Sequence, residues 1–188
     1  MSEKYKTQQG DNVYFVTFTI VDWLNVLEHK KYIDILVDCI KYYQLNKGLR
    51  IFGYCIMPNH VHMIVQGTEK WSVSEILRDL KKISNRKIVQ ALQEEDSKKS
   101  GQILSLFKEA ADKIKRVKNF KVWQDGNHAI LLYSNKFYWQ KLNYIHMNPV
   151  KKGLCINTWD YEYSSARDYT GHKSVLDVVC LDKELRTY

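Results

Sequence analysis

The sequence has little of what usually divides a chain or anchors it in a membrane. Its 188 residues include only two prolines and eight glycines, and neither type gathers into a linker. No apolar run is long enough to span a bilayer, and residues 1–4 lack the apolar stretch of a signal peptide. We therefore expect one cytoplasmic domain over residues 1–188, with a core from about 13 to 150, a tail from 151 to 188 and no membrane contact.

Cysteine is also sparse and widely spaced. The four cysteines are Cys39, Cys55, Cys155 and Cys180, and no pair has the close spacing of a zinc ribbon or a redox motif. Cys39 and Cys55 sit inside apolar runs, where we expect them to be small core residues with reduced thiols.

Acidic residues are outnumbered by basic ones. The sequence has 21 Asp and Glu against 29 Lys and Arg, which gives a formal charge of +8. This balance favours a polyanionic partner, with nucleic acid the first candidate, although a merely soluble basic protein would share it. The basic side chains gather at three places, where we expect contacts with phosphates. These candidate nucleic-acid-binding residues are Arg78, Lys81, Lys82, Arg86, Lys87, Lys115, Arg116, Lys118, Lys151 and Lys152.

Hydrophobic periodicity predicts four strands and three main helices. Runs rich in β-branched and aromatic residues predict the strands, and apolar residues three or four apart predict the helices. Ser72 and Glu75 have the spacing of a capping box, and Ser134 or Asn135 can cap the last helix, which we expect Pro149 to stop. The predicted strands are 13–20, 49–57, 60–66 and 122–132, and the predicted helices are 29–46, 73–92 and 135–148.

The order of these elements predicts an α+β, ferredoxin-like (βαββαβ) fold. Strands 49–57 and 60–66 are so close in sequence that a hairpin is expected between them. Two helical crossovers flank this hairpin, which gives an antiparallel sheet with helices on one face, followed by a C-terminal tyrosine-bearing helix and a tail. Residues 94–101 are polar and predict a loop, and 102–118 are basic and weakly helical, an excursion from the domain.

His60 and His62 are the first candidate site residues. Side chains alternate faces along a strand, so both imidazoles project the same way while Val61, Met63 and Val65 project into the core. Two imidazoles at this spacing can share one metal ion. A pair of solvent-facing histidines on a half-buried strand is the competing interpretation of so short a motif.

Tyr144 and Asn148 form a second candidate cluster. They are four residues apart on the predicted helix, on a different face from the apolar stripe of Tyr138, Leu142 and Ile145. A tyrosine with only a packing role would more naturally join that stripe, although most of the 13 tyrosines must be packing residues.

Together these residue types suit phosphodiester cleavage. A divalent cation on a non-bridging oxygen offsets the charge of the phosphate and orients the phosphorus for in-line attack. Two imidazoles and an amide oxygen suit Mn²⁺ by ligand type, whereas Mg²⁺ prefers oxygen ligands but is abundant in cells, so both ions stay open. Attack by tyrosine would give a covalent phosphotyrosine, and attack by water would give hydrolysis.

These segments resemble the single-tyrosine transposases that carry a histidine–hydrophobe–histidine (HUH) motif. Residues 58–62, Pro-Asn-His-Val-His, are similar to that motif, and residues 144–154 are similar to the tyrosine helix of the REP-associated tyrosine transposases. Residues 122–124 and 163–167 also look like segments of that subgroup. The resemblance extends from about Val13 to Tyr169, and several spaced motifs agree in order.

The resemblance implies a ferredoxin-like domain that cleaves single-stranded DNA through a 5′-phosphotyrosine link, near hairpins formed by palindromic repeats. It implies that His60 and His62 are metal ligands, that Tyr144 is the nucleophile and that Asn148 is the third ligand. Related transposases form dimers, so a homodimer stays open beside a monomer.

Two other functions stay open. A non-catalytic ferredoxin-like nucleic-acid-binding module would need no metal, but it would leave the placement of Tyr144 and Asn148 unexplained. A metal phosphohydrolase would use water in place of Tyr144.

Overall fold

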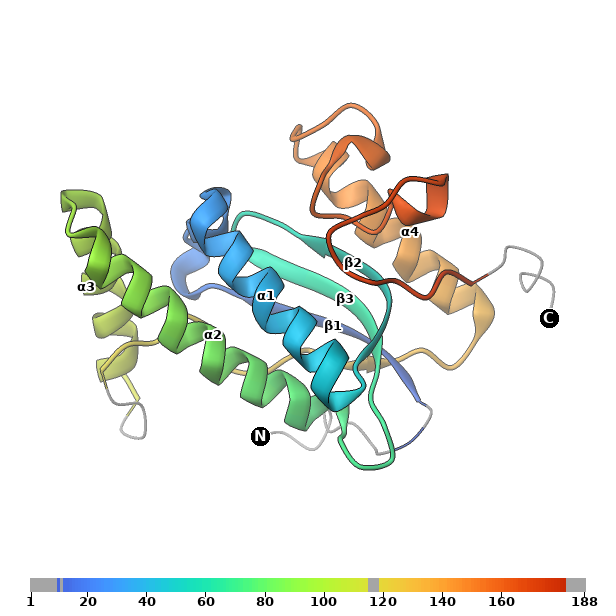
Figure 1. The fold of residues 1–188 in the computed structure, drawn as a ribbon, viewed down its shortest axis with the longest axis horizontal. Coiled ribbons are helices and arrows are strands. Elements are labelled where there is room, and N and C mark those ends of the chain that lie inside the picture. Colours follow the sequence, from blue (N-terminus) through green and yellow to red (C-terminus); the bar gives the residue numbers. More distant parts are fainter. Residues whose placement is uncertain (1–9, 11, 115–118, 182–188) are drawn as a thin grey trace.

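Four antiparallel strands form a sheet in the order β2-β3-β1-β4 (Figure 1). The computed structural model describes residues 10, 12–114 and 119–181. The predicted α+β, βαββαβ arrangement is confirmed, with α3 inserted after α2 and with α4 at the C-terminal end of the fold. The main elements are β1 (Val13–Thr19), α1 (Lys30–Lys47), β2 (Arg50–Ile56), β3 (His60–Gln66), α2 (Val73–Glu95), α3 (Lys98–Asp112), β4 (Ile130–Leu131) and α4 (Asn135–Lys151).

One face of the sheet is covered by α1 and α2 (Figure 1). Val16 and Phe18 of β1 and Val61 and Met63 of β3 point to this face, and none is more than 1% exposed. The predicted capping box of α2 is present, because the Ser72 hydroxyl accepts from the backbone N–H of Glu75 and its own N–H donates to the Glu75 carboxylate. This face holds the larger of the two hydrophobic clusters and provides most of the burial that stabilises the fold.

The opposite face is covered in part by α4 and the chain that follows it. Phe15 and Ile64 of the sheet pack there against Leu142 and Ile145. Gly53 permits this close approach, because a Cβ at position 53 would lie 2.4 Å from the Leu142 side chain. The C-terminal segment then runs beside β2, where Cys55 and Ser164 form an antiparallel bridge, so the tail packs back on the domain as expected.

The polar segment 94–101 is helical over most of its length, and the loop predicted there is wrong. α2 continues to Glu95, and Asp96 interrupts it with a left-handed backbone (φ 44°). The Ser97 hydroxyl then accepts from the backbone N–H of Ser100 and starts α3, so a second capping box sets a new helix where polarity alone indicates a loop. α3 packs beside α2 (Figure 1) and buries Phe107 in the larger hydrophobic cluster.

The fourth strand is much shorter than the predicted span 122–132. Trp123 forms a single bridge with Ile20, and regular pairing with β1 resumes only at Ile130 and Leu131. A turn lies between these points, with positive φ at Gly126 and His128. Pairing therefore breaks where the backbone turns away from the extended conformation.

The last helix begins as predicted but does not stop at Pro149. The Ser134 hydroxyl accepts from the N–H of Phe137 at its start. Pro149 removes one backbone donor within the final turn, and the helix continues to Lys151 before Gly153 takes a left-handed conformation. None of the helices in the described residues has the length and apolar composition needed to cross a bilayer.

Candidate active site

The paired histidines lie at the start of β3, on the face of the sheet that α4 covers. The centres of the His60 and His62 rings are 4.7 Å apart. On the neighbouring strand β1, Thr19 pairs with His60 and Thr17 with His62, so the same strand alternation presents all four side chains to this face. The shared orientation predicted from the sequence is confirmed.

Each imidazole is oriented through its Nδ1 atom. His60 Nδ1 lies 2.7 Å from Asn59 Oδ1, and His62 Nδ1 lies 2.8 Å from Thr17 Oγ1. The Asn59 amide nitrogen donates to Trp23 O and Asn25 Oδ1, so its oxygen is the acceptor and His60 Nδ1 carries the proton. This tautomer leaves the lone pair of His60 on Nε2, where a ligand can use it.

Burial keeps both imidazoles neutral. Desolvation, with a smaller contribution from Lys152, lowers the pKa of His60 to about 4. Desolvation, with smaller contributions from His60 and Lys141, lowers the pKa of His62 to about 3. The His62 Nε2 atom is buried and has no hydrogen-bond partner among the described residues. A neutral imidazole with an unused buried nitrogen is what metal coordination requires.

Helix α4 brings Tyr144 next to His62. Their ring centres are 5.2 Å apart, and the Tyr144 ring also meets Phe15 edge-on at 6.1 Å. Tyr144 is 42% exposed, so its phenol is open to a ligand from solvent. Asn148 lies one turn further along the same side of α4, is 9% exposed, and its amide nitrogen donates to the Tyr144 carbonyl at 3.3 Å. This bond leaves the amide oxygen of Asn148 available as an acceptor or ligand.

His60 and His62 alone give too few ligands for a divalent cation, and a third ligand must come from a side chain other than a carboxylate. Among the described residues, no three His, Cys, Asp or Glu side chains gather as a metal site. The two histidines therefore need a further ligand of another type, and the amide oxygen of Asn148 is a chemically suitable one.

Two basic side chains adjoin the site from α4. Lys141 Nζ lies 4.8 Å from the ring centre of Phe15 and 5.9 Å from that of Tyr144. Lys152 is close enough to His60 to lower its pKa. Lys141, Tyr144, Asn148 and Lys152 follow one another at intervals of three or four residues and so form one stripe along the helix.

A strained turn adjoins the other end of the site. Asp22 and Trp23 both have positive φ, 52° and 56°, which is costly for residues other than glycine. The Trp23 ring meets His60 edge-on with centres 5.8 Å apart and is 59% exposed. A large aromatic ring held in solvent beside a polar site is suited to stacking on an unpaired base.

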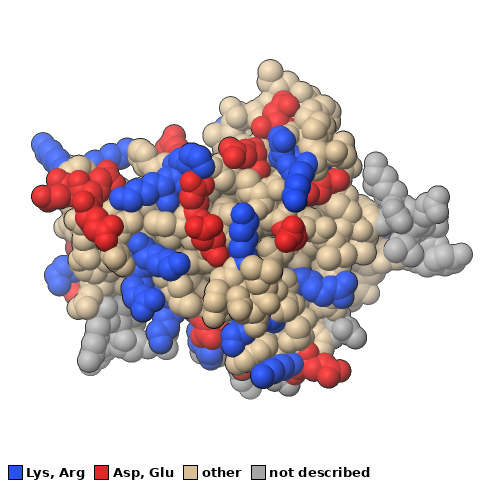
Figure 2. Space-filling view, viewed as in Figure 1, with Lys and Arg blue, Asp and Glu red and all other residues tan. Residues whose placement is uncertain are grey.

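The basic cluster on α2 lies on the opposite face of the sheet from the histidines. Arg78, Lys82, Arg86 and Lys87 are exposed there, and Figure 2 shows that basic and acidic side chains are interspersed on this face. The fifth member, Lys81, donates to Gln124 O at 2.7 Å and to Gly126 O at 2.8 Å, so its ammonium is engaged within the protein. Burial lowers the pKa of Lys81 to about 8. Lys115, Arg116 and Lys118 lie outside the described residues, whereas Lys151 and Lys152 are exposed at the end of α4.

Several residues at the site are not among those predicted from the sequence. Lys141 could have been found from its position three residues before Tyr144, on the same side of the helix. Asn59 precedes His60 directly, but its role depends on the contacts of its amide with the turn at Trp23 and Asn25. Thr17 and Trp23 have no local signal, because strand pairing and the turn after β1 bring them to the histidines.

Comparisons with known proteins find a family model and solved structures that are similar to this chain. Residues 15–105 match the family model described as "Transposase IS200 like", a span that includes His60 and His62 and ends before α4. A solved structure of a REP-associated tyrosine transposase bound to a REP hairpin is 20% identical, with a TM-score of 0.62 over 97% of this chain and 96% of that one. A candidate transposase from Deinococcus radiodurans R1 is 19% identical, with a TM-score of 0.45 over 74% of this chain and 95% of that one. No match is found among curated proteins.

The sheet with paired histidines on a central strand and a tyrosine-bearing helix above them is the fold of a single-tyrosine transposase. Over residues 15–105 the chain is similar to the IS200-like transposases, a family of enzymes that nick DNA.

Proposed function

We propose that the chain is a metal-dependent single-stranded DNA endonuclease and strand transferase that acts through a 5′-phosphotyrosine intermediate at REP-like hairpins. The observation that carries this proposal is the distance of 5.2 Å between the ring centres of Tyr144 and His62 within one chain. The exposure of the phenol supports access by a DNA strand. A hairpin substrate is supported by the similar fold of a transposase that binds a REP hairpin.

In the proposed reaction the phenol oxygen of Tyr144 attacks the scissile phosphorus. A bond forms between phosphorus and Oη as the bond from phosphorus to the 3′ oxygen breaks. The phenol proton leaves to solvent, and a proton completes the departing 3′ hydroxyl. The 5′ phosphate stays on Tyr144, so attack by another 3′ hydroxyl reverses the step and joins strands.

The surrounding residues support this chemistry in different ways. His60, His62 and Asn148 would hold Mg²⁺ or Mn²⁺, which supplies positive charge to the phosphate when bound. Asn59 and Thr17 fix the two imidazole rings. Lys141 adds a cation beside the Tyr144 ring, where the substrate phosphate must arrive.

We propose that one chain is sufficient for the reaction. Tyr144 of α4 already lies beside His62 of the same chain, so no tyrosine from a partner subunit is needed. The active site would then form within one chain, and a homodimer would affect DNA binding or regulation without completing the site.

The test compares Tyr144→Phe with Tyr133→Phe. Tyr133 is a matched control because it is 79% exposed and precedes α4, outside the contacts of the histidine pair. Labelled single strands that carry the palindromes flanking the gene are incubated with Mn²⁺ and separated by denaturing electrophoresis. We expect the wild type and Tyr133→Phe to give a labelled protein band, and Tyr144→Phe to bind the strand without cutting it.

The same gel separates the competing functions. A hydrolase would still cut in the Tyr144→Phe variant and would never give a labelled protein band. A binding module would shift the strand in a native gel, and none of the three proteins would cleave it.

A further inference from the structure

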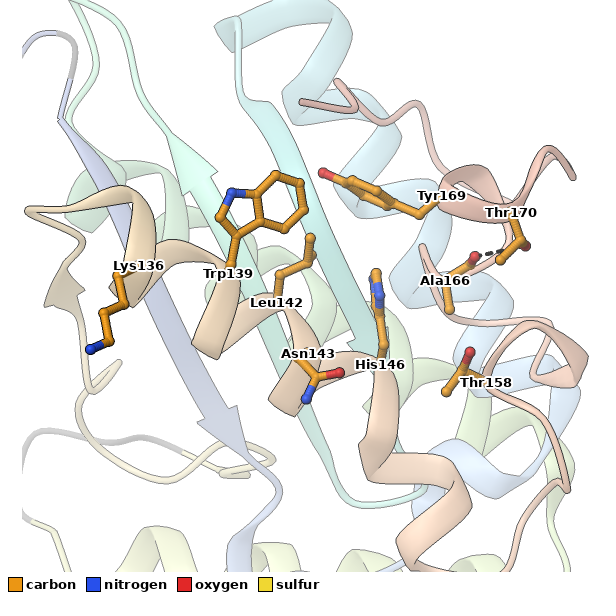
Figure 3. Close-up of a pocket in the computed structure, with 9 residues that line it drawn as sticks. All are labelled: Lys136, Trp139, Leu142, Asn143, His146, Thr158, Ala166, Tyr169 and Thr170. Atoms are coloured by element: carbon orange, nitrogen blue, oxygen red, sulfur yellow. Dashed lines mark hydrogen bonds between the residues drawn. The ribbon is translucent and has the colours of Figure 1, made fainter. Parts of the chain in front are cut away.

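A hollow of about 580 Å³ lies on the other side of α4, between this helix and the C-terminal segment (Figure 3). Trp139, Asn143 and His146 line it from α4, whereas Lys141, Tyr144 and Asn148 lie on the side of the helix that faces the histidine pair. The hollow is therefore separate from the candidate active site, although Asn143 directly precedes Tyr144. We call it the α4–tail pocket.

Aromatic rings form part of its wall. The Trp139 and Tyr169 rings lie with their centres 6.3 Å apart at an angle of 84°. Figure 3 shows both rings at the same end of the pocket, one from the helix and one from the C-terminal segment. A flat aromatic ligand can stack on one ring and meet the other edge-on. The volume is within the range of pockets that hold small organic molecules, about 300–1,000 Å³.

His146 lines this pocket and is held there by Ser165. The Ser165 hydroxyl accepts from Tyr54 N–H at 2.8 Å and donates to Tyr54 O at 3.2 Å. The His146 Nε2 atom lies 2.8 Å from the same hydroxyl, so a hydrogen bond ties the imidazole to the C-terminal segment. The ring is therefore held in place as part of the pocket wall.

The other polar groups complete a surface for a nucleobase. The Asn143 side chain is exposed, and its amide has no hydrogen-bond partner within the described residues. The Thr170 hydroxyl lies within hydrogen-bond distance of the carbonyls of Ala166 and Arg167 and of His172 Nδ1, so its proton is used and its oxygen can accept from a ligand. Lys136 lies at the edge of the pocket, where Figure 3 shows its ammonium away from the aromatic rings. This position suits a phosphate attached to a base that stacks inside.

We propose that the α4–tail pocket receives one unpaired adenine of the strand that Tyr144 cuts. The Asn143 amide can donate to N7 and accept from the N6 amino group, the pairing by which asparagine recognises adenine. The Thr170 oxygen, as an acceptor, also favours a base with an amino group. Because Asn143 and Tyr144 are consecutive in α4, a base held here fixes the register of the strand relative to the nucleophile. This inference rests on the proposed function for the identity of the strand.

The experiment uses the full chain with Tyr144→Phe, so that cleavage does not remove bound strands. Hairpins with a randomised single-stranded flank are bound, recovered and sequenced. We expect one flank position to favour adenine over thymine about tenfold. The preference should disappear in the added variant Asn143→Ala. It should remain in Asn46→Ala, an exposed asparagine at the end of α1 on the opposite face of the sheet.

Two outcomes would overturn the proposal. One is a flank without any preferred base, and the other is an adenine preference that Asn143→Ala leaves intact. A competition experiment compares two sources of adenine, free dAMP and an adenine within the DNA strand. If free dAMP binds the pocket much more strongly than the strand does, the assignment to DNA is overturned. Circular dichroism checks that the Asn143→Ala variant is folded. We expect it to fold, because the Asn143 side chain is exposed and contributes little to the core.

Failure of this inference is distinguishable from failure of the proposed function. The covalent adduct is measured separately with wild-type protein on the same strands. An adduct without base preference would reject the pocket and leave the reaction intact. An adenine preference that depends on Asn143, without any adduct, would support the pocket and reject the reaction.

Discussion

The two faces of the sheet differ in what strand β3 contributes to each. Val61 and Met63 point to the face under α1 and α2, where both are fully buried among apolar side chains. His60 and His62 point to the opposite face, are only 8% and 5% exposed, and carry imidazoles that burial keeps neutral. One face of β3 therefore stabilises the fold, and the other holds polar groups at a cost in desolvation.

This difference shows how a small sheet can hold a buried polar site. Hydrophobic burial on the α1 and α2 side offsets the desolvation of the histidine pair on the other side. Adjacent residues of β3 contribute hydrophobic burial on one face and a desolvated polar site on the other. Single substitutions can therefore separate the two effects.

The largest expected effect comes from substituting neighbours on opposite faces. We expect His62→Ala to reduce covalent-adduct formation on the order of 10³-fold, because a ligand of the proposed metal is lost. Met63→Ala should instead lower the free energy of unfolding by about 2–5 kcal/mol, because it leaves a cavity in the core. Urea denaturation and adduct assays on both variants provide the comparison. Equal loss of stability in the two variants would contradict the division of roles between the faces.

The second expected effect concerns how closely α4 approaches the sheet. Gly53→Val should move α4 outward, because even a Cβ at this position would lie 2.4 Å from Leu142 Cδ1. A displacement of about 1 Å in the position of Tyr144 can reduce the cleavage rate about 10²-fold. Gly53→Ala is the control, since rotation of the flexible Leu142 side chain can accommodate one methyl group with a smaller loss. Single-turnover cleavage rates for the two variants test whether Gly53→Val loses more activity than Gly53→Ala.

Much of this site was predictable from local sequence. Strand alternation placed His60 and His62 on one face, and helical spacing placed Tyr144 beside Asn148, as the structure has them. The order of strands and helices along the chain and the α2 capping box followed from equally local patterns.

The rest depended on contacts between distant parts of the chain. Thr17 reaches His62 through the register of β1 and β3, 45 residues apart in sequence. Lys81 looked like a phosphate contact because its helix is basic, but its ammonium holds the turn at residues 124–126. The break in the fourth strand lies at the same turn, where Asp125-Gly126-Asn127 favour a turn over a continuous strand.

The smallest expected effect compares lysines on the two faces. Lys152 lies near His60 at the end of α4, whereas Lys82 is exposed on α2 on the other face of the sheet. We expect Lys152→Ala to weaken binding of single-stranded DNA less than about tenfold and to lower the slope of log Kd against log salt by about 0.7, the contribution of one phosphate contact. Lys82→Ala should leave the slope unchanged, because α2 does not share a face with Tyr144.

Fluorescence anisotropy between 50 and 200 mM salt, the range over which such contacts weaken measurably, tests both variants. An equal decrease in slope for Lys82→Ala would mean that the strand crosses the edge of the sheet and contacts α2, which would restore the α2 cluster to the DNA-binding surface.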